Sequence, residues 1–177
     1  MKARHNHMNK ITPEATVEEF QRWWLKVGCP LRPPFKDGVF TTDIAYSLVL
    51  FRESPFQVEL YICKPNTNAP FHQHPGVDSS FIYLTGNLDF GRSDGKYTDL
   101  KEYQKARLNS TVHHLLGQSV SAPNGALHTL KVYAEGGAFL SFEKWNEQDP
   151  TSVTINWKGE AVGEEHKEIL GNAHKHW

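Results

Sequence analysis

The stretch FHQHPGVDSSF at residues 71–81 decides the fold, because it places two histidines two positions apart just before an aromatic, apolar run. Successive side chains of a β-strand point to opposite faces of the sheet. His72 and His74 would therefore point the same way and could reach one metal ion together. This geometry permits a metal site without requiring one, and any further ligand has to come from elsewhere in the chain.

A second stretch, GQSVSAPNGALH at residues 117–128, offers that further ligand. Pro123 and Gly125 favour a tight turn, and the turn leads His128 into an apolar run with the composition of a strand. The two stretches together supply three imidazoles.

Short runs rich in Val, Ile, Phe, Tyr and Leu fill the chain between residues 39 and 146, and clusters of Gly, Pro, Asn and Ser separate them. This spacing is typical of an antiparallel barrel or sandwich, so the predicted fold class is all-β. The glycines at 136 and 137 are expected to form a turn between the last two strands. The strands are predicted over residues 44–51, 56–63, 80–90, 111–116, 127–134 and 138–145.

An N-terminal helix is predicted over residues 12–28, with Thr12 or Thr16 as its cap and Gly28 after its last turn. Its apolar positions recur at helical spacing, so we expect it to pack on the outside of a larger body.

The chain becomes polar after residue 146, with a short strand expected at 153–157 and a helix at 163–170. We interpret this part as an extension that covers an edge or a partner subunit. The predicted organisation is an N-terminal helical arm (1–38), a barrel (39–146) and a C-terminal extension (147–177).

Composition narrows the class of protein. The 177 residues suit one domain, and 19 Lys and Arg against 20 Asp and Glu give no strong attraction for nucleic acid or an anionic membrane. No segment has the apolar length of a signal peptide or a membrane span, so we expect a cytoplasmic protein. Cys29 and Cys63 lie in no metal-binding spacing, which favours reduced thiols.

The two histidine stretches resemble the two motifs of the cupin superfamily. The first motif runs H-x-H, then an acidic residue, then a glycine, and the second runs G-x5-P-x-G-x2-H. The resemblance implies a cupin double-stranded β-helix, or jelly-roll barrel, that binds a divalent metal at its mouth through His72, His74 and His128. The matching residues are His72, His74 and Gly86 in the first motif, and Gly117, Pro123, Gly125 and His128 in the second.

The chain departs from the first motif at its acidic position, where Ser79 stands five residues after His74. The resemblance therefore implies a neutral set of three histidines. Asp78 is one residue from the acidic position, but strand alternation turns it away from the interior. His113 and His114 precede the second motif, where a structural or substrate-contacting role is commoner than ligation.

A neutral ligand set leaves the full charge on a divalent ion, which favours an anionic, chelating substrate. The pattern is similar to that of cupin dioxygenases with non-haem Fe(II), including cysteine dioxygenase and the diketone-cleaving enzymes. Cysteine dioxygenase has a cysteine at the position of Ser79, followed by Gly-Asn-Leu as at Gly86, Asn87 and Leu88 here. Since Ser79 cannot form that family's thioether crosslink, the resemblance supports the metal better than cysteine as substrate.

The resulting expectation is an Fe(II) dioxygenase that uses O2 on a small chelating substrate: a thiol acid, a diketone or a hydroxy-aromatic acid. The alternatives are a redox-neutral lyase or isomerase with Zn, Ni or Mn as Lewis acid, and a binding protein without turnover. The cupin resemblance also implies pairing through barrel edges, so we expect a homodimer.

Strand alternation also predicts the pocket walls. Ser79, Phe81 and Tyr83 share one face, and Leu130 and Val132 share the face of His128. Such a pocket would be apolar and aromatic. Tyr83 is the candidate catalytic proton donor, with filling of the barrel core as the alternative role.

Overall fold

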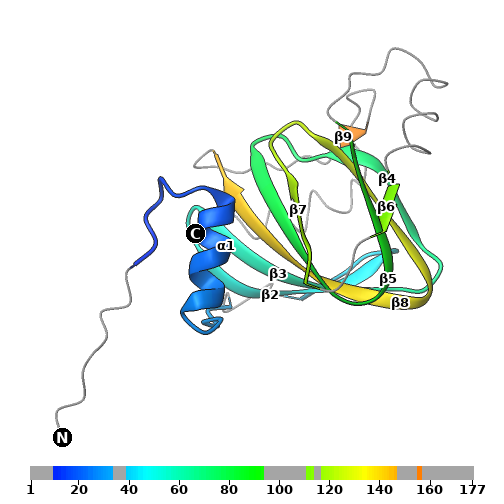
Figure 1. Cartoon of the computed structure of the whole chain (residues 1–177), viewed down its shortest axis with the longest axis horizontal. Coiled ribbons are helices and arrows are strands. Elements are labelled where there is room, and N and C mark those ends of the chain that lie inside the picture. The colour runs from blue at the N-terminus through cyan, green and yellow to red at the C-terminus, as the bar shows by residue number, and fades with distance from the viewer. Residues whose placement is uncertain (1–9, 34–38, 94–110, 114–116, 147–154, 157–177) are drawn as a thin grey trace, which may run out of the picture.

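The computed structural model describes residues 10–33, 39–93, 111–113, 117–146 and 155–156, which form one helix and a rolled antiparallel sheet (Figure 1). The helix is α1 (Val17–Lys26). The strands are β1 (Val39–Thr41), β2 (Ala45–Glu53), β3 (Phe56–Cys63), β4 (Asn68–Gln73), β5 (Val77–Ser93), β6 (Thr111–His113), β7 (Ser119–Ala122), β8 (Leu127–Trp145) and β9 (Ile155–Asn156).

The long antiparallel ladder between β5 and β8 organises the sheet. Val77 pairs with Trp145 at one end of this ladder, and Ser93 pairs with Leu127 at the other. The first part of β8 also pairs with β4 and its second part with β3, while β5 pairs on its other side with β6 and β7. The sheet thereby closes on itself (Figure 1). This is the all-β double-stranded β-helix that the sequence predicts, with one added helix.

A bend in the middle of the ladder lets both long strands take part in two walls of the barrel. Gly86 has φ +92°, and a Cβ at this position would lie 2.3 Å from the carbonyl oxygen of Gly136. Only glycine tolerates this combination of backbone conformation and close approach. The register of the ladder shifts on both sides of Gly86, as expected of a strand that bends at bulges.

The turn predicted at residues 135–137 is wrong, because β8 runs without interruption from Leu127 to Trp145. Glycines in an apolar run also mark bends inside long strands, and here Gly137 pairs with Gly86 across the ladder.

Other predicted boundaries shift or fall outside the described residues. The strand predicted at 80–90 extends over Val77–Ser93, and β1, β4 and β7 were not among the predicted strand ranges. Residues 114–116 and the helix predicted at 163–170 lie outside the described residues, and of the strand predicted at 153–157 only Ile155–Asn156 is described.

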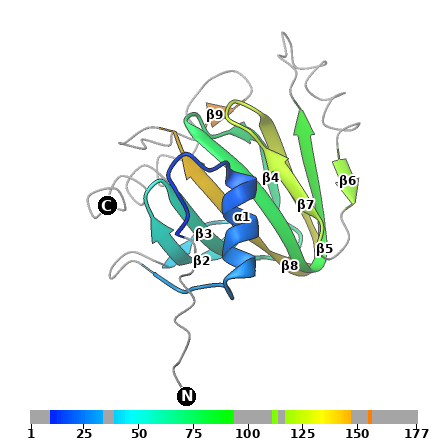
Figure 2. The same cartoon turned by 60° about the vertical axis from the view of Figure 1, so that its left-hand side comes forward.

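The helix α1 covers the outer face of the sheet, as its apolar spacing predicts (Figure 2). It begins at Thr16, not Thr12: the Thr16 hydroxyl accepts from the Glu19 amide at 3.2 Å, and the Glu19 carboxylate accepts from the Thr16 amide at 2.9 Å. Phe20 is fully buried, with its ring stacked 4.5 Å from that of Phe56 on β3. No helix among the described residues has the length and hydropathy of a membrane span.

A separate apolar cluster fills part of the barrel interior. It includes the pocket residues predicted from strand alternation, among them Phe81, Tyr83, Leu130 and Val132. The described cysteines are both free thiols; Cys63 is buried, which raises the pKa of its thiol to about 12, and Cys29 is exposed.

Candidate metal centre

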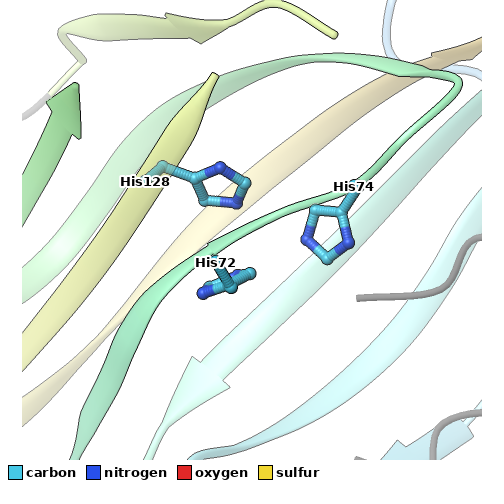
Figure 3. A group of neighbouring side chains, drawn as sticks. All are labelled: His72, His74 and His128. Atoms are coloured by element: carbon cyan, nitrogen blue, oxygen red, sulfur yellow. The ribbon is translucent and has the colours of Figure 1, made fainter. Parts of the chain in front are cut away.

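Three histidines meet at one end of the barrel (Figure 3). His72 on β4 pairs directly with His128 on β8, and His74 follows β4 by one residue. One ring nitrogen from each lies within 4.8 Å of the others. The ring centroids of His72 and His128 are 4.3 Å apart, and that of His74 lies 5.0 and 5.1 Å from them. Segments more than fifty residues apart in the sequence thus deliver three imidazoles to one point.

Hydrogen bonds between the two histidine-bearing turns hold this end of the barrel together. The Gly76 amide donates to the side-chain oxygen of Asn124 at 2.9 Å, and the Asn124 amide donates to the Asp78 carboxylate at 2.8 Å. The turn after His74 is therefore tied to the turn that precedes His128. The same contacts bring the start of β5 to the start of β8.

His128 is the most buried of the three, with 8% of its surface exposed. Its Nδ1 lies 3.2 Å from the Ala126 carbonyl oxygen, which can only accept, so this contact requires the proton on Nδ1. Burial, with a smaller effect of nearby His72, lowers the pKa of His128 to about 3. The ring is therefore neutral in the physiological range, and its Nε2 lone pair is available to a metal.

The donor chemistry of this cluster fits a divalent transition metal. Imidazole nitrogen suits Fe, Zn, Ni and Cu, and a set of three on one side of an ion leaves positions for substrate or water. Among the described residues, the cluster includes no carboxylate or thiolate. His72 and His74 are only partly buried, so the cluster is accessible from the barrel mouth.

The alternative ligands considered from the sequence are not part of this cluster. Asp78 accepts hydrogen bonds from the Asn124 amide and, at 2.9 Å, from the Asn146 side chain, so its carboxylate stabilises the mouth turns. His113 lies on β6, where its backbone pairs with Asp89, and His114 lies outside the described residues.

The predicted pocket residues all lie on the inner side of the barrel wall. Phe81 lies next to the histidine cluster, with its ring centroid 5.8 Å from that of His128. Ser79 is buried next to it along β5, with 3% of its surface exposed. Leu130 and Val132 continue the face of His128 along β8, and both are buried in the apolar cluster.

The Tyr83 side chain is fixed by a hydrogen bond to the backbone. Its hydroxyl donates to the carbonyl oxygen of Gly86, at the bend of the ladder, and its side chain is 4% exposed within the apolar cluster. A structural tyrosine would have the same environment. Its role as a catalytic proton donor stays a prediction.

A buried polar network on the inner face of β3 and β8 was missed from the sequence. The Gln57 amide nitrogen donates to Glu59 at 3.2 Å and to Glu143 at 3.3 Å. The Tyr61 hydroxyl donates to Glu59 at 3.1 Å, and the Ser141 hydroxyl donates to Glu143 at 3.1 Å. The signal was present, because residues 57, 59 and 61 put polar groups on one face of a predicted strand.

Burial raises the pKa of both carboxyl groups in this network, and because the two carboxylates repel each other, a proton on one of them relieves the repulsion. Burial alone raises the pKa of Glu59, and burial together with the nearby charge of Glu59 raises the pKa of Glu143 to about 8. The Arg52 guanidinium opposes both shifts. Burial and the two carboxylates hold the pKa of Tyr61 well above its ordinary value, so its hydroxyl stays a donor.

Comparison with known proteins supports the fold. No protein-family model matches the sequence, and no curated protein matches it. The DMSP lyase DddQ from Ruegeria pomeroyi DSS-3 matches in structure with a TM-score of 0.50 and 14% identity, over 84% of this chain and 72% of that one.

Two further solved structures have lower scores. The Cnp3 cupin domain of Schizosaccharomyces pombe has a TM-score of 0.47 and 14% identity, over 60% of this chain and 67% of that one. A double-stranded β-helix protein from Klebsiella pneumoniae subsp. pneumoniae MGH 78578 has a TM-score of 0.46 and 14% identity, over 77% of this chain and 93% of that one. With the strand topology and the histidine cluster, the chain is a cupin-fold protein with a candidate metal centre.

Proposed function

We propose that the protein is a metal-dependent cupin enzyme, a mononuclear non-haem Fe(II) dioxygenase acting on a small chelating organic acid or diketone. The observation that carries this proposal is a cluster of three imidazoles without a carboxylate among the described residues. Neutral ligands cancel none of the ion's charge, so an anionic chelating substrate would complete the coordination. When bound, the ion would supply Lewis acidity and open positions for substrate and dioxygen.

The chain's own residues have defined tasks in this proposal. His128, fixed by its contact with the Ala126 carbonyl, keeps its Nε2 directed away from the backbone and unprotonated. We call the barrel interior next to the three histidines the chamber. Phe81 lies against His128 and would give the chamber an apolar wall that excludes water from one side of a bound substrate. The partly buried His72 and His74 leave the mouth side open for substrate entry.

The test begins with metal analysis of protein purified without added metal. Iron, together with O2 consumption by Fe(II)-loaded protein on chelating acids or diketones, would support the dioxygenase. His128→Ala is the matched control and should lose both the metal and the O2 consumption. Full metal occupancy in His128→Ala would refute the ligand assignment.

A redox-neutral lyase or isomerase is the second candidate, favoured by the buried carboxyl groups of Glu59 and Glu143. Such groups can hold and move protons at a substrate bound to Zn, Ni or Mn. The structural similarity to a DMSP lyase is compatible with this candidate through the fold alone. Zinc, nickel or manganese in the purified protein, with no O2 consumption, would favour it over the dioxygenase; binding without turnover is the remaining outcome.

We further propose a homodimer in the cytoplasm. Tyr46 and Ile62, paired across β2 and β3, leave 51% and 53% of their surfaces exposed on the outer face of the sheet, beside exposed Leu48. Covering apolar side chains such as these stabilises association. Sedimentation of the wild type and of Ile62→Glu tests this, since a dimer through this face would dissociate in the variant and a monomeric wild type would contradict the proposal.

A further inference from the structure

Two carboxyl groups on the inner barrel wall share one donor. The Gln57 side-chain nitrogen lies 3.2 Å from a Glu59 oxygen and 3.3 Å from a Glu143 oxygen, so the two carboxyl groups are neighbours. Neighbouring carboxylates in a buried position repel each other, and the pair is more stable with one proton. Outside the histidine cluster, these are two carboxyl groups on the described part of the inner wall that are close enough to share a proton.

The pair lies at the same end of the barrel as the candidate metal centre, on the other of the two walls that β8 joins. His128 and Glu143 are near opposite ends of β8, but the ladder bends at Gly86, and the Asn124 contacts bring its two ends to the barrel mouth. Ser79, buried on the inner face of β5, is the direct cross-strand neighbour of Glu143. Cross-strand side chains on one face are neighbours.

A second chain of contacts connects the pair to the histidines. Phe81 lies 5.8 Å from His128 between ring centroids and pairs across the strands with Ser141. The Ser141 hydroxyl in turn donates to Glu143 at 3.1 Å. A substrate held at the histidines and against Phe81 would therefore extend toward Glu143.

The members of the network differ in burial. Gln57 and Glu59 have 2% and 5% of their surfaces exposed, whereas Tyr61 and Glu143 are only partly buried. Since these side chains belong to the inner face of the wall, their exposed surface faces the barrel interior. Glu143 is thus the more exposed of the two carboxyl groups.

We propose that Glu59 and Glu143 form the proton-accepting group of the chamber, taking up the proton that a chelating acid releases when it binds the metal as an anion. This inference rests on the proposed metal centre. In the step, the X–H bond of the acid breaks and its electron pair stays on X, which faces the metal. The proton forms an O–H bond on the ionised carboxylate oxygen of the pair, so charge is conserved within the chamber.

The side chains around the carboxyl pair do not accept this proton at neutral pH. Arg52 on β2 stays charged and donates to Gln57 at 2.7 Å, and Tyr61 on β3 stays protonated because its pKa is raised. The Cys63 thiol, with its pKa raised to about 12, also stays protonated. On β8 and β5 the neighbours Ser141 and Ser79 do not titrate.

The test uses full-length zinc-loaded protein and acetohydroxamic acid, a chelating acid that binds metals as its anion. Calorimetric titrations in buffers of different ionisation enthalpy give the number of protons released per acid bound. We expect the wild type to retain the proton, and the double variant Glu59→Gln/Glu143→Gln, which has no carboxyl group left to accept it, to release about one more proton per acid bound; the single variants Glu59→Gln and Glu143→Gln each keep one acceptor and should resemble the wild type in proton release. The double variant should bind the acid about tenfold more weakly at neutral pH and keep its zinc.

Glu53→Gln is the matched control, because Glu53 lies outside the chamber in ion pairs with Arg32 and, at 3.4 Å, with Lys10. It should behave as the wild type. Equal proton release by the wild type and the double variant, with zinc bound in both, would overturn this inference and leave the metal centre standing. Absence of zinc binding by the wild type would overturn the proposed function and this inference with it.

Discussion

The outer and inner faces of β3 and β8 are both buried, yet they differ completely in chemistry. On the outer face Phe56, Val58 and Phe142 pack under α1 in one apolar cluster, and each is at most 1% exposed. On the inner face of the same strands, Glu59 and Glu143 belong to a hydrogen-bonded network. The comparison teaches that the helix side supplies stability and the barrel side is available for chemistry.

The largest expected effect is on the outer face. Phe20→Ala removes a fully buried ring that stacks on Phe56 and contacts Phe51, and it leaves a cavity between α1 and the sheet. We expect the free energy of unfolding to fall by about 3–5 kcal/mol, measured by urea denaturation. Zinc content of the folded variant should be unchanged; loss of metal would mean that the two faces are not independent.

The next largest effect is expected for His72→Ala, which changes the histidine cluster inside the barrel and not the outer face. Removal of one of three imidazoles should weaken metal binding by more than the roughly 100-fold that loss of an outer partner costs. Competition with a chromophoric chelator measures this affinity. The stability of the metal-free protein should change little, because His72 is only partly buried. A large loss of stability without metal would assign His72 a structural role.

The pH dependence of stability should come from the inner face. Glu143 has its pKa raised from 4.5 to about 8, so the folded state binds its proton more tightly than the unfolded state between these values. The unfolded chain then carries fewer protons on this group. Because the lowered pKa of His128 gives the opposite slope below its unfolded value of 6.5, the free energy of unfolding should fall as pH rises from 6.5 through about 8. Urea denaturation at several pH values should show this decline, and Glu143→Gln should flatten it. An equal decline in both proteins would contradict the assignment.

The smallest effect is expected at the start of α1. Thr16→Ala removes the hydroxyl that accepts from the Glu19 amide, at a cost of about 1 kcal/mol of stability by urea denaturation. Thr12→Ala is the matched control, because the helix does not begin there. Equal losses for the two variants would show that the cap at Thr16 contributes nothing specific. Neither substitution should change the metal affinity.

The all-β class could be predicted from the spacing of short apolar runs, which is a local signal, whereas the double-stranded β-helix and the meeting of His72, His74 and His128 followed from the resemblance to the cupin motifs. The sequence did not predict that β8 is continuous, since glycines in a strand read as a turn until the partner strand is known. It also missed the carboxyl pair. In β3, residues Phe56, Val58 and Leu60 alternate with Gln57 and Glu59, and alternation defines two faces without saying which one lines the barrel. The usual assignment of the polar face to solvent fails here because a helix covers the apolar face.

The long β5–β8 ladder has a consequence for synthesis of the chain. Ser93 can pair with Leu127 only after the start of β8 has left the ribosome. Val77 can pair with Trp145 only after the end of β8 has left it. A nascent chain that ends before residue 127 contains His72, His74 and Glu59 but lacks both His128 and Glu143. Such a truncated product therefore has neither the complete histidine cluster nor the carboxyl pair. Both sites depend on pairings between residues far apart in the sequence, which form late in folding. Metal retention would then report that a cell has made this protein to the end of its barrel.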